Sequence, residues 1–378
     1  MKKFKLIGNR LLRILVLLLI AAVVGFGVIW IGTQKPPAPV VESQKPPGSS
    51  LLNTTLKEFD DKGNLLWEVK SERADYRQDQ KVADVVKVQG KFYKDGKPLI
   101  EATADGGVIN QANREITLKS NVKAIALKDK ITLVADNMVW NSDRDLLTAT
   151  GHLKIDKFDQ KISIVGKTLK ANPSVNTFTI EKDVIVTSVK PPVEIKGEAI
   201  TWNADTHKVF SKLPLDVLQV KDKLTVKAKK GEWDTKTQIV TLENEIKGKD
   251  PKLDVEIETS KVLWNIEKQL VTLPVEFKAI STSRGLEVTA MKGEAQLDTE
   301  KINLVGRVQA SFKSTQGVVN ADKVEWLIPT QMVTGDGNVT YRQPEKNLNV
   351  AGDRAVANLE KQTVQVTGTN VITQITPQ

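Results

Sequence analysis

The chain contains no cysteine and only two histidines among its 378 residues. Without cysteine the fold cannot be held by disulfides, and a cysteine-ligated zinc site is excluded. His152 and His207 fall at predicted strand ends or turns, where a histidine on the surface is the simplest interpretation. Neither a G-x-S-x-G nor an H-E-x-x-H sequence is present. We therefore predict no catalytic residue, no metal site and no cofactor, and expect that the protein is not an enzyme.

Aromatic residues make up only 5% of the chain, yet most of its seven tryptophans follow one spacing. Trp140, Trp202, Trp233, Trp264 and Trp326 are separated by 62, 31, 31 and 62 residues, all multiples of 31. We call each position of this series an anchor. The remaining anchors are Ile109, Ala171, Ala295 and Ala357. Five tryptophans in one register indicate an internal repeat of 31 residues.

The residues around each anchor repeat with it. Seven residues after the anchor stand Ile116, Leu147, Phe178, Val209, Val240, Val271, Ile302, Val333 and Val364, all apolar. Seven residues before it stand Ala102, Leu133, Ile164, Ile195, Val226, Ile257, Val288, Val319 and Val350, again all apolar. Five residues before it stand Ala104, Ala135, Gly166, Gly197, Ala228, Thr259, Ala290, Ala321 and Gly352, all small. The repeat therefore covers most of the chain.

Within each unit the apolar residues are spaced by two, which predicts β-strands. Each unit reads as one hairpin whose two arms are broken near their middles. On the first arm the break is a change of parity between the small residue and the anchor. On the second arm it is often a glycine: Gly151, Gly306, Gly335, Gly337 or Gly368. Because such breaks bend a strand, we predict an all-β fold, an elongated antiparallel β-jellyroll or two-sheet sandwich of 31-residue hairpins.

The predicted array spans residues 100–378. Residues 51–99 match the repeat less strictly, since Trp67 is off the register. We interpret them as a capping hairpin, with a turn from Asp60 to Asn64, followed by a degenerate first repeat. Atypical end units of this kind are usual in repeat proteins.

Residues 11–33 are almost continuously apolar and predict a transmembrane anchor helix. A cleaved signal peptide is the competing interpretation, but the stretch is long for one and no small-x-small cleavage site follows it. Residues 1–10 are basic and are expected in the cytoplasm, which places the bulk of the chain outside it. Residues 34–50 contain five prolines and predict a semi-rigid linker.

The net charge of +9 is concentrated at the N-terminus. Lys2, Lys3, Lys5, Arg10 and Arg13 account for +5 of it, which leaves 9 − 5 = +4 for all the residues that follow. So small an excess on so long a chain does not indicate a nucleic-acid partner.

Acidic residues recur four positions before the anchor, as Asp105, Asp136, Glu198, Asp322 and Asp353. Because they are periodic, we interpret them as part of the repeat geometry rather than as a catalytic pair. The segment 141–145 resembles the start of a calcium loop, but it lacks the loop's glycine and its distant glutamate. A polar turn is the simpler interpretation.

Short motifs in this order make the chain resemble the LptC family of lipopolysaccharide-export proteins, within the OstA-like β-jellyroll group that includes LptA. The motifs that follow the predicted anchor helix are Phe59-x3-Gly63-x2-Leu66-Trp67, Ala74-Asp75-Tyr76, Phe92-Tyr93 and Ala104-Asp105-Gly106-Gly107. The resemblance covers the predicted span and the first two or three repeats best. The later repeats resemble the OstA-like pattern in general.

The resemblance implies a single-pass inner-membrane protein whose jellyroll lies in the periplasm. It would take lipopolysaccharide or a similar glycolipid from an ABC transporter and pass it toward the outer membrane. Typical members have a shorter periplasmic part, so the additional repeats raise the hypothesis that they replace part of a bridge built elsewhere from separate subunits.

We predict that acyl chains contact inward residues of the array and that the final strands dock another OstA-like sheet by strand addition. The predicted lipid contacts are Leu133, Trp140, Leu153, Ile195, Trp202, Val240, Val271 and Val308. The predicted docking edge contains Val350, Val364, Val366 and Ile372.

Two other functions remain open at this stage. The array can be a fully packed structural rod, with the tryptophans as core residues and no lipid cargo. An enzyme on a repetitive β-scaffold, such as a polysaccharide lyase, requires a cluster of acidic or basic side chains on one outer face, and the sequence shows none.

Overall fold

The computed structural model describes residues 48–375 except residues 61, 80, 95, 128–130, 158–160, 173, 174, 176, 190, 191, 204, 221, 222, 235, 252, 253, 362 and 370. The predicted cytoplasmic segment, anchor helix and most of the predicted linker lie outside the described residues. No helix in the described part is long and apolar enough to cross a membrane. The described chain forms two compact units. Residues 48–191 and 196–209 make up the N-terminal unit, and residues 192–195 and 210–375 make up the C-terminal unit.

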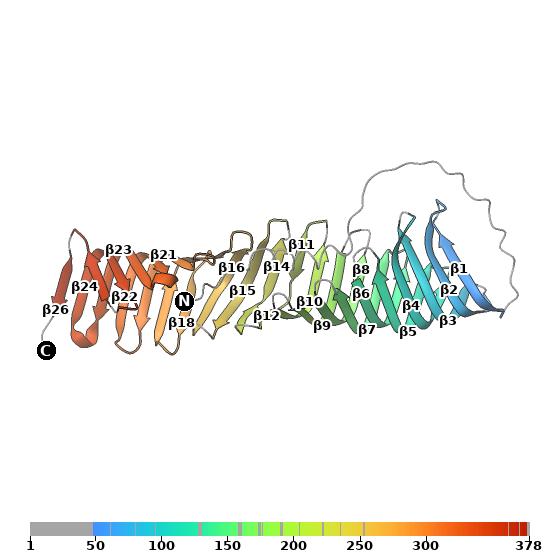
Figure 1. Cartoon of the computed structure of the whole chain (residues 1–378), viewed down its shortest axis with the longest axis horizontal. Coiled ribbons are helices and arrows are strands. Elements are labelled where there is room, and N and C mark those ends of the chain that lie inside the picture. The colour runs from blue at the N-terminus through green and yellow to red at the C-terminus, as the bar shows by residue number, and fades with distance from the viewer. Residues whose placement is uncertain are drawn as a thin grey trace, which may run out of the picture. The chain divides into compact units, whose positions relative to one another are not determined.

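The N-terminal unit is a series of long antiparallel strands in which each strand from the first to the ninth pairs with the next (Figure 1). The strands are β1 (Ser50–Phe59), β2 (Leu65–Tyr76), β3 (Val82–Lys94), β4 (Lys97–Asn110), β5 (Glu115–Ala126), β6 (Ile131–Asn141), β7 (Leu146–Lys157), β8 (Ile162–Asn172), β9 (Thr177–Val189) and most of β10 (Pro192–Asn203). β1 and β2 form a hairpin that is closed by a turn in which Asp60 accepts hydrogen bonds from Lys62 and Asn64.

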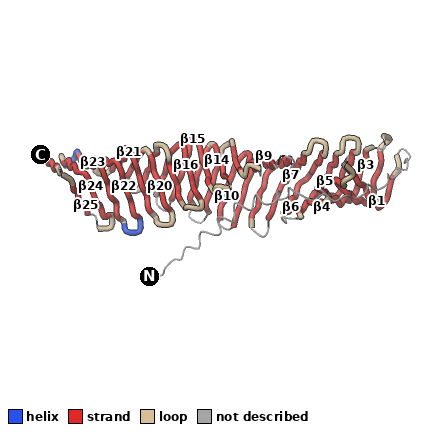
Figure 2. The backbone as a smooth tube through the Cα atoms, turned by 90° about the horizontal axis from the view of Figure 1, so that it is seen from above, coloured by secondary structure: helices blue, strands red, loops and turns tan. Residues whose placement is uncertain are grey.

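The C-terminal unit continues the pattern, but several of its arms are divided into two short strands (Figure 2). β11 (Lys208–Ser211) leads into this unit. Its further strands are β12 (Leu215–Gln219), β13 (Leu224–Ala228), β14 (Lys230–Asp234), β15 (Ile239–Asp250), β16 (Val255–Asn265), β17 (Leu270–Leu273), β18 (Phe277–Ser281), β19 (Leu286–Ala290), β20 (Lys292–Gln296), β21 (Lys301–Phe312), β22 (Gly317–Leu327), β23 (Met332–Gln343), β24 (Leu348–Asn358), β25 (Thr363–Thr367) and β26 (Ile372–Ile375). Two single turns of 3₁₀-helix, η2 (Ile328–Thr330) and η3 (Pro344–Lys346), lie in the hairpin loops. The predicted all-β antiparallel fold is confirmed.

The two arms of a repeat are joined by a polar turn that begins directly after the anchor. Asn141 Oδ1 accepts a hydrogen bond of 2.9 Å from the backbone N–H of Arg144, and Asn265 Oδ1 accepts one of 2.9 Å from that of Lys268. Asn side chains stabilise turns in this way because they imitate a backbone carbonyl. The segment 141–145 is therefore a polar turn, and His207 lies in the corresponding turn with an exposed side chain.

The breaks predicted in the arms are β-bulges that recur at one position of the repeat. Eleven and twelve residues after the anchor, two successive residues adopt a left-handed backbone, as at Gly151 (φ 75°) and His152 (φ 27°). They face the single residue Asp136 on the neighbouring arm, so two residues oppose one and the strand bends. The pairs Ser120 and Asn121, Lys182 and Asp183, Asn244 and Glu245, Gly306 and Arg307, and Gly337 and Asn338 repeat this arrangement.

The glycine positions were predicted correctly only in part. Gly151, Gly306 and Gly337 have positive φ and lie at bends. Gly335 instead lies in a regular stretch of β23 opposite Ala355, and the bend follows two residues later. Where Pro214 occupies the position twelve residues after the anchor, the arm is interrupted before β12, because proline cannot adopt a left-handed φ.

Candidate functional site

The apolar residues of the repeat form continuous cross-strand rows on the inner face of the C-terminal unit. The anchors and the residues seven positions after them form the anchor row: Trp233, Val240, Trp264, Val271, Ala295, Ile302, Trp326, Val333, Ala357 and Val364. Each member lies directly opposite the next. Direct cross-strand neighbours are about 5 Å apart, so the row is an uninterrupted apolar track across the strands.

A second track, the far row, lies on the other side of the bend. It consists of Val226, Gly248, Ile257, Ala279, Val288, Ala310, Val319, Tyr341, Val350 and Thr373, again paired in succession. Between the two tracks, at the bend, lies the bend row, which includes Ile246, Phe277, Ala290, Val308, Ala321 and Val339.

The three rows differ in exposure. The bend row is buried, with Val308 exposed by 4% and Phe277 by 5%. Ile257 of the far row and Leu273 and Leu304 of the other half of the arms pack against the cluster formed by Phe277, Ala290 and Val308. The two halves of the arms therefore share one interior. Apart from the buried Trp233 and the exposed Val364, the anchor row is partly buried, and every apolar residue of the far row is partly buried too. The interior of the C-terminal unit is thus dry at the bend and open to solvent along both tracks.

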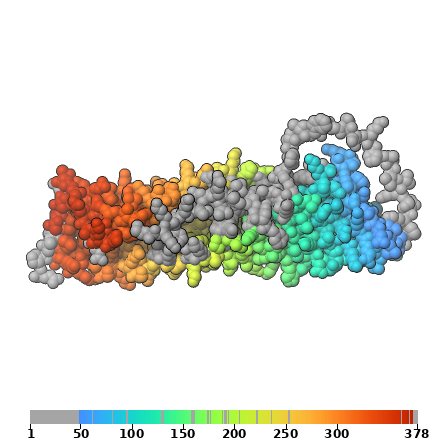
Figure 3. Space-filling view, in the orientation of Figure 1, coloured from blue at the N-terminus to red at the C-terminus, as the bar shows by residue number. Residues whose placement is uncertain are grey.

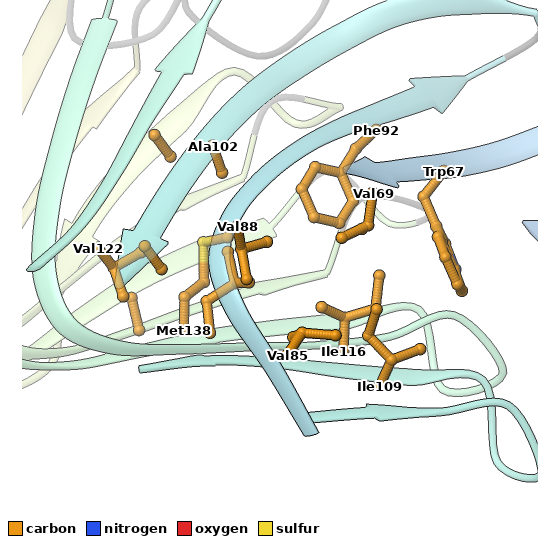
Figure 4. Packing of buried hydrophobic residues seen from close by; sticks show 14 of the residues in the cluster. Trp67, Val69, Val85, Val88, Phe92, Ala102, Ile109, Ile116, Val122 and Met138 are labelled. Atoms are coloured by element: carbon orange, nitrogen blue, oxygen red, sulfur yellow. The ribbon is translucent and has the colours of Figure 1, made fainter. Parts of the chain in front are cut away.

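The N-terminal unit has the same rows but a closed interior. One large cluster of buried side chains fills it, and Figure 4 shows its residues from both halves of the arms packed together. Trp67 and Val122 have no exposed surface. Ile109 and Ile116, which occupy the repeat positions of the anchor row in this unit, are each exposed by 1%. Trp140 and Leu133 are partly buried and pack against this cluster.

The eight predicted lipid contacts therefore fall into two groups. Leu153, Trp202 and Val308 are covered by the protein itself, with exposed fractions of 2%, 6% and 4%. Trp202 also stacks on Phe178 with a ring-centroid distance of 5.1 Å. The partly exposed contacts are Leu133, Trp140, Ile195, Val240 and Val271. Of these, Val240 and Val271 both lie directly opposite Trp264, one on each side of it, on the open anchor row.

Sequence reasoning left out several residues of the open tracks. Trp264, Ile302, Trp326 and Val333 belong to the anchor row and are partly exposed. The 31-residue register contained the signal for all four, because they occupy the same repeat positions as Trp140 and Val271. The register does not predict how deeply each residue is buried, and this burial differs between the two units.

The final strands form an edge of the C-terminal unit, at the red end of Figure 3. β25 and β26 both pair with β24, and no further strand of the described chain is paired to their other side. Val364 and Ile372 are exposed by 68% and 58%, and Val366 is partly buried. Val350 lies on β24, between Tyr341 of β23 and Thr373 of β26. Its backbone is therefore one strand inside the edge.

Many polar side chains of the described chain stabilise the bends and turns. The residue four positions before an anchor forms a hydrogen bond with the residue sixteen positions after itself. Asn121 Nδ2 donates to Asp105 at 2.5 Å, and Asn338 Nδ2 donates to Asp322 at 2.7 Å. Asp353 accepts hydrogen bonds from the backbone N–H and the hydroxyl of Thr369, which hold the pKa of its carboxyl below the usual value. Asp105, Asp322 and Asp353 are thus part of the repeat geometry, as predicted.

No group of three or more histidine, aspartate or glutamate side chains in the described chain is arranged to hold a metal ion. Asp254 illustrates the local role of the carboxylates: it accepts hydrogen bonds from the hydroxyls of Ser283 and Ser281 and from the Ser283 backbone, which lower its pKa. What the site offers chemically is apolar surface.

Comparisons with known proteins agree with the resemblance noted in the sequence. The family described as lipopolysaccharide-assembly, LptC-related matches residues 15–189, a little under half of the chain. No curated protein sequence matches the chain.

Two solved structures show distant likeness. LptH from Pseudomonas aeruginosa, the LptA-homologous periplasmic component of the lipopolysaccharide transport device, is 19% identical, with 30% of this chain and 81% of that chain covered and a TM-score of 0.25. Apo AztD from Citrobacter koseri is 10% identical, with 78% and 95% covered and a TM-score of 0.11. At these scores neither likeness bears on function. Over residues 15–189, which include most of the predicted span and the first repeats, the chain is similar to the LptC-related family of lipopolysaccharide-assembly proteins.

Proposed function

We propose that this protein is a lipid-transfer component of lipopolysaccharide export that holds acyl chains between the two apolar tracks of its C-terminal unit. The observation that carries the proposal is the partial exposure of the anchor row and the far row. A folded protein gains by covering such surface, because apolar area buried from water contributes roughly 25 cal/mol per Å². Two parallel tracks that stay open are therefore suited to an apolar occupant from outside the chain.

Acyl chains fit this surface in chemistry and in form. Each methylene group buried against apolar side chains contributes about 0.8 kcal/mol. The transfer of a chain of a dozen methylenes from water to this surface is therefore favourable. The tracks cross the strands without a charged residue from Val240 to Val364. An extended hydrocarbon chain can follow such a track and move along it, because no position on it is bound more specifically than the next.

The remaining steps of the proposal come from the family and from the N-terminal sequence. Residues 11–33 would anchor the protein in the inner membrane with the described units in the periplasm. An ABC transporter would deliver lipopolysaccharide or a related glycolipid, and an OstA-like jellyroll protein would receive it at the β25–β26 edge. The exposed Val364 and Ile372 support the edge as a docking site, because unpaired strands invite strand addition.

A structural role is the second candidate, and one observation favours it for the N-terminal unit. Its interior is filled by its own side chains, with Trp67 and Val69 showing no exposed surface. A lipid chain has no room there without displacing them. In the proposal the N-terminal unit is therefore a packed structural support, and the open C-terminal unit holds the lipid.

The test is a charge placed inside the tracks and, as a matched control, one placed outside. Val271 lies on the anchor row, and Thr272, the next residue of β17, faces the opposite side of the sheet. We expect Val271→Asp to lose the lipopolysaccharide that copurifies with the full chain, because an ionised carboxylate is expelled from hydrocarbon, while Thr272→Asp retains it. Hydrogen exchange of β16–β18 shows whether both variants are folded. Equal lipid content in the two folded variants would contradict the proposal.

A further inference from the structure

A second apolar surface lies on the outside of the N-terminal unit, where a packed support has no need of one. Ile125, Leu127, Val134 and Val189 are exposed by 37%, 36%, 39% and 57%. Leu127 and Val189 stand at hairpin tips on the same edge, eighteen residues after the anchors Ile109 and Ala171. Their backbone N–H groups bond to Leu99 and Lys161, which fixes both tips to the strands beside them.

Two rows of the outer face lie next to these tips. The nearer row contains Glu101, Ile125, Thr132, Asp156 and Ser163, and the next row alternates lysine with aliphatic residues. Val134 lies directly opposite Lys123 on one side and Lys154 on the other, and Lys154 lies opposite Val165, which lies opposite Ile185. Lys154 forms an ion pair with Asp156 at 2.9 Å. Lys123 and Lys161 are exposed and have no ion-pair partner among the described residues.

Most of these tip positions differ in the C-terminal unit. The first of them, Val220, is still aliphatic and is exposed by 50%, and those that follow are Pro251, Thr282, Lys313 and Pro344. The outer face carries ion pairs in both units, such as Lys247 with Glu258 at 3.0 Å in the C-terminal unit and Lys91 with Glu101 at 2.9 Å in the N-terminal unit. Since an exposed tip adds nothing to the stability of its own hairpin by being apolar, the aliphatic tips of the N-terminal unit indicate contact with something outside the chain.

We propose that this outer face, formed by Ile125, Leu127, Val134 and Val189 with Lys123 and Lys161, rests on an anionic lipid bilayer. Aliphatic tips flanked by unpaired lysines combine the two features by which a protein surface binds such a membrane: apolar insertion at the headgroup boundary and attraction to anionic lipids. The proposal uses the anchor predicted in residues 11–33, which brings this unit, the nearer of the two in the sequence, close to the bilayer.

The predicted linker is long enough for this placement. The chain enters β1 at the edge opposite the tips, since Ser49 accepts a hydrogen bond from Tyr76 at the end of β2. A straight 12-residue strand such as β2 is about 40 Å long at roughly 3.3 Å per residue. A proline-rich spacer over residues 34–47 reaches about 43 Å at roughly 3.1 Å per residue. The tips can therefore lie on the bilayer while the chain still reaches β1.

The absence of native cysteine makes a direct test available in the full-length protein. Single variants Val189→Cys and Leu127→Cys carry a spin label, and Val175→Cys serves as the control. Val175 lies at a hairpin tip on the opposite edge of the same unit and is exposed by 52%, close to the value for Val189. Each is reconstituted in vesicles of phosphatidylcholine alone or mixed with phosphatidylglycerol, and collisions with oxygen and with a water-soluble nickel chelate are compared.

We expect labels at positions 189 and 127 to gain oxygen collisions and lose nickel collisions in the anionic vesicles, while the label at 175 stays in water. Lys123→Gln should reduce the membrane-contacting population about fivefold, since one lysine near an anionic surface is worth about that factor. Labels at 189 and 175 that respond alike would overturn the proposal. So would a label at 189 that stays in water in vesicles and is covered only in native membranes, because the surface then belongs to a protein partner.

Flotation of the same samples keeps this result separate from the predicted anchor. A chain that does not float with the vesicles contradicts the anchor. A chain that floats while position 189 stays in water contradicts only the proposed face. Loss of lipid transport with an intact label response concerns the C-terminal tracks and leaves this face in place.

Discussion

Nδ1 of His152 lies 2.8 Å from a carboxylate oxygen of Asp136, sixteen residues earlier in the chain. Asp136 is the single residue that faces the left-handed pair Gly151 and His152 across the bulge. The same sixteen-residue relationship joins Lys229 to Glu245 at 3.3 Å and Arg307 to the sulfur of Met291 at 2.7 Å. The residue types of these contacting pairs vary, while their positions in the repeat stay the same. Each bend is therefore tied across its outer side by one polar or charged contact.

Gly151→Ala should destabilise the N-terminal unit by about 1–2 kcal/mol, because a left-handed backbone is unfavourable for alanine. The added Cβ would also collide with the carboxylate of Asp136. Urea unfolding followed by hydrogen exchange of peptides from β6 and β7 measures the change. The control is Gly248→Ala, whose Cβ would meet nothing closer than 4.0 Å and which has no positive φ. That variant should be neutral or slightly stabilising, and equal losses in both would refute the bend as the cause.

Removing a tryptophan should affect the two units very differently. Trp67 has no exposed surface, so Trp67→Ala should cost about 3–5 kcal/mol. Trp326 is partly exposed on an open track, and Trp326→Ala should cost distinctly less. Peptide-resolved hydrogen exchange in denaturant reports each unit separately. Similar losses at the two sites would mean that the C-terminal interior is as closely packed as the N-terminal one.

Asp84 should make the N-terminal unit less stable in acid. Arg77 donates two hydrogen bonds to its carboxylate, at 2.9 and 2.8 Å, and this holds the pKa of Asp84 below its usual value. A lowered folded-state pKa adds stability that is complete above the unfolded value of about 3.9 and is lost as the pH falls through the folded-state value. Both side chains are about half exposed, so the effect should stay below about 1 kcal/mol. Asp84→Asn should abolish this part of the acid dependence, and an unchanged pH profile would rule it out.

Deleting residues 359–378 removes β25 and β26 and leaves β24 as the edge. We expect the shortened chain to stay folded up to β24 and to lose binding to a purified OstA-like jellyroll protein, because the docking strands are gone. Pull-down with full-length and shortened chains compares them directly. Undiminished binding of the shortened chain would show that docking takes place elsewhere.

The spacing of five tryptophans was enough to predict the repeat, the hairpins, the polar turns and the bends. Side-chain alternation and turn residues are local properties, so a 31-residue register places them reliably. The positions of the left-handed pairs were predicted only where they contain glycine. Ser120, Lys182 and Asn244 adopt the same backbone without it, because the bulge is imposed by pairing with the neighbouring arm.

The lipid-contact residues could be predicted less well than the fold, because the burial of an inward residue depends on how closely the two halves of the arms approach each other. Ile116 and Val240 both stand seven residues after an anchor, yet Ile116 is exposed by 1% and Val240 stays partly open. Leu153, exposed by 2%, stands thirteen residues after its anchor, at the bend. Val308 was chosen for the same pattern and lies at the buried bend. The register identifies which residues face inward. It does not determine how far apart the facing tracks lie.

Site-specific photo-crosslinking in living cells tests the central claim most directly. A photoreactive residue replaces Val271 on the anchor row or, as the control, Lys268 in the exposed turn before it. We expect a lipopolysaccharide adduct at position 271 that depends on ATP hydrolysis, and none at 268. A folded protein that gives no adduct at 271, nor at Val240 or Ile302 on the same row, would contradict it and leave the packed structural rod as the function of this chain.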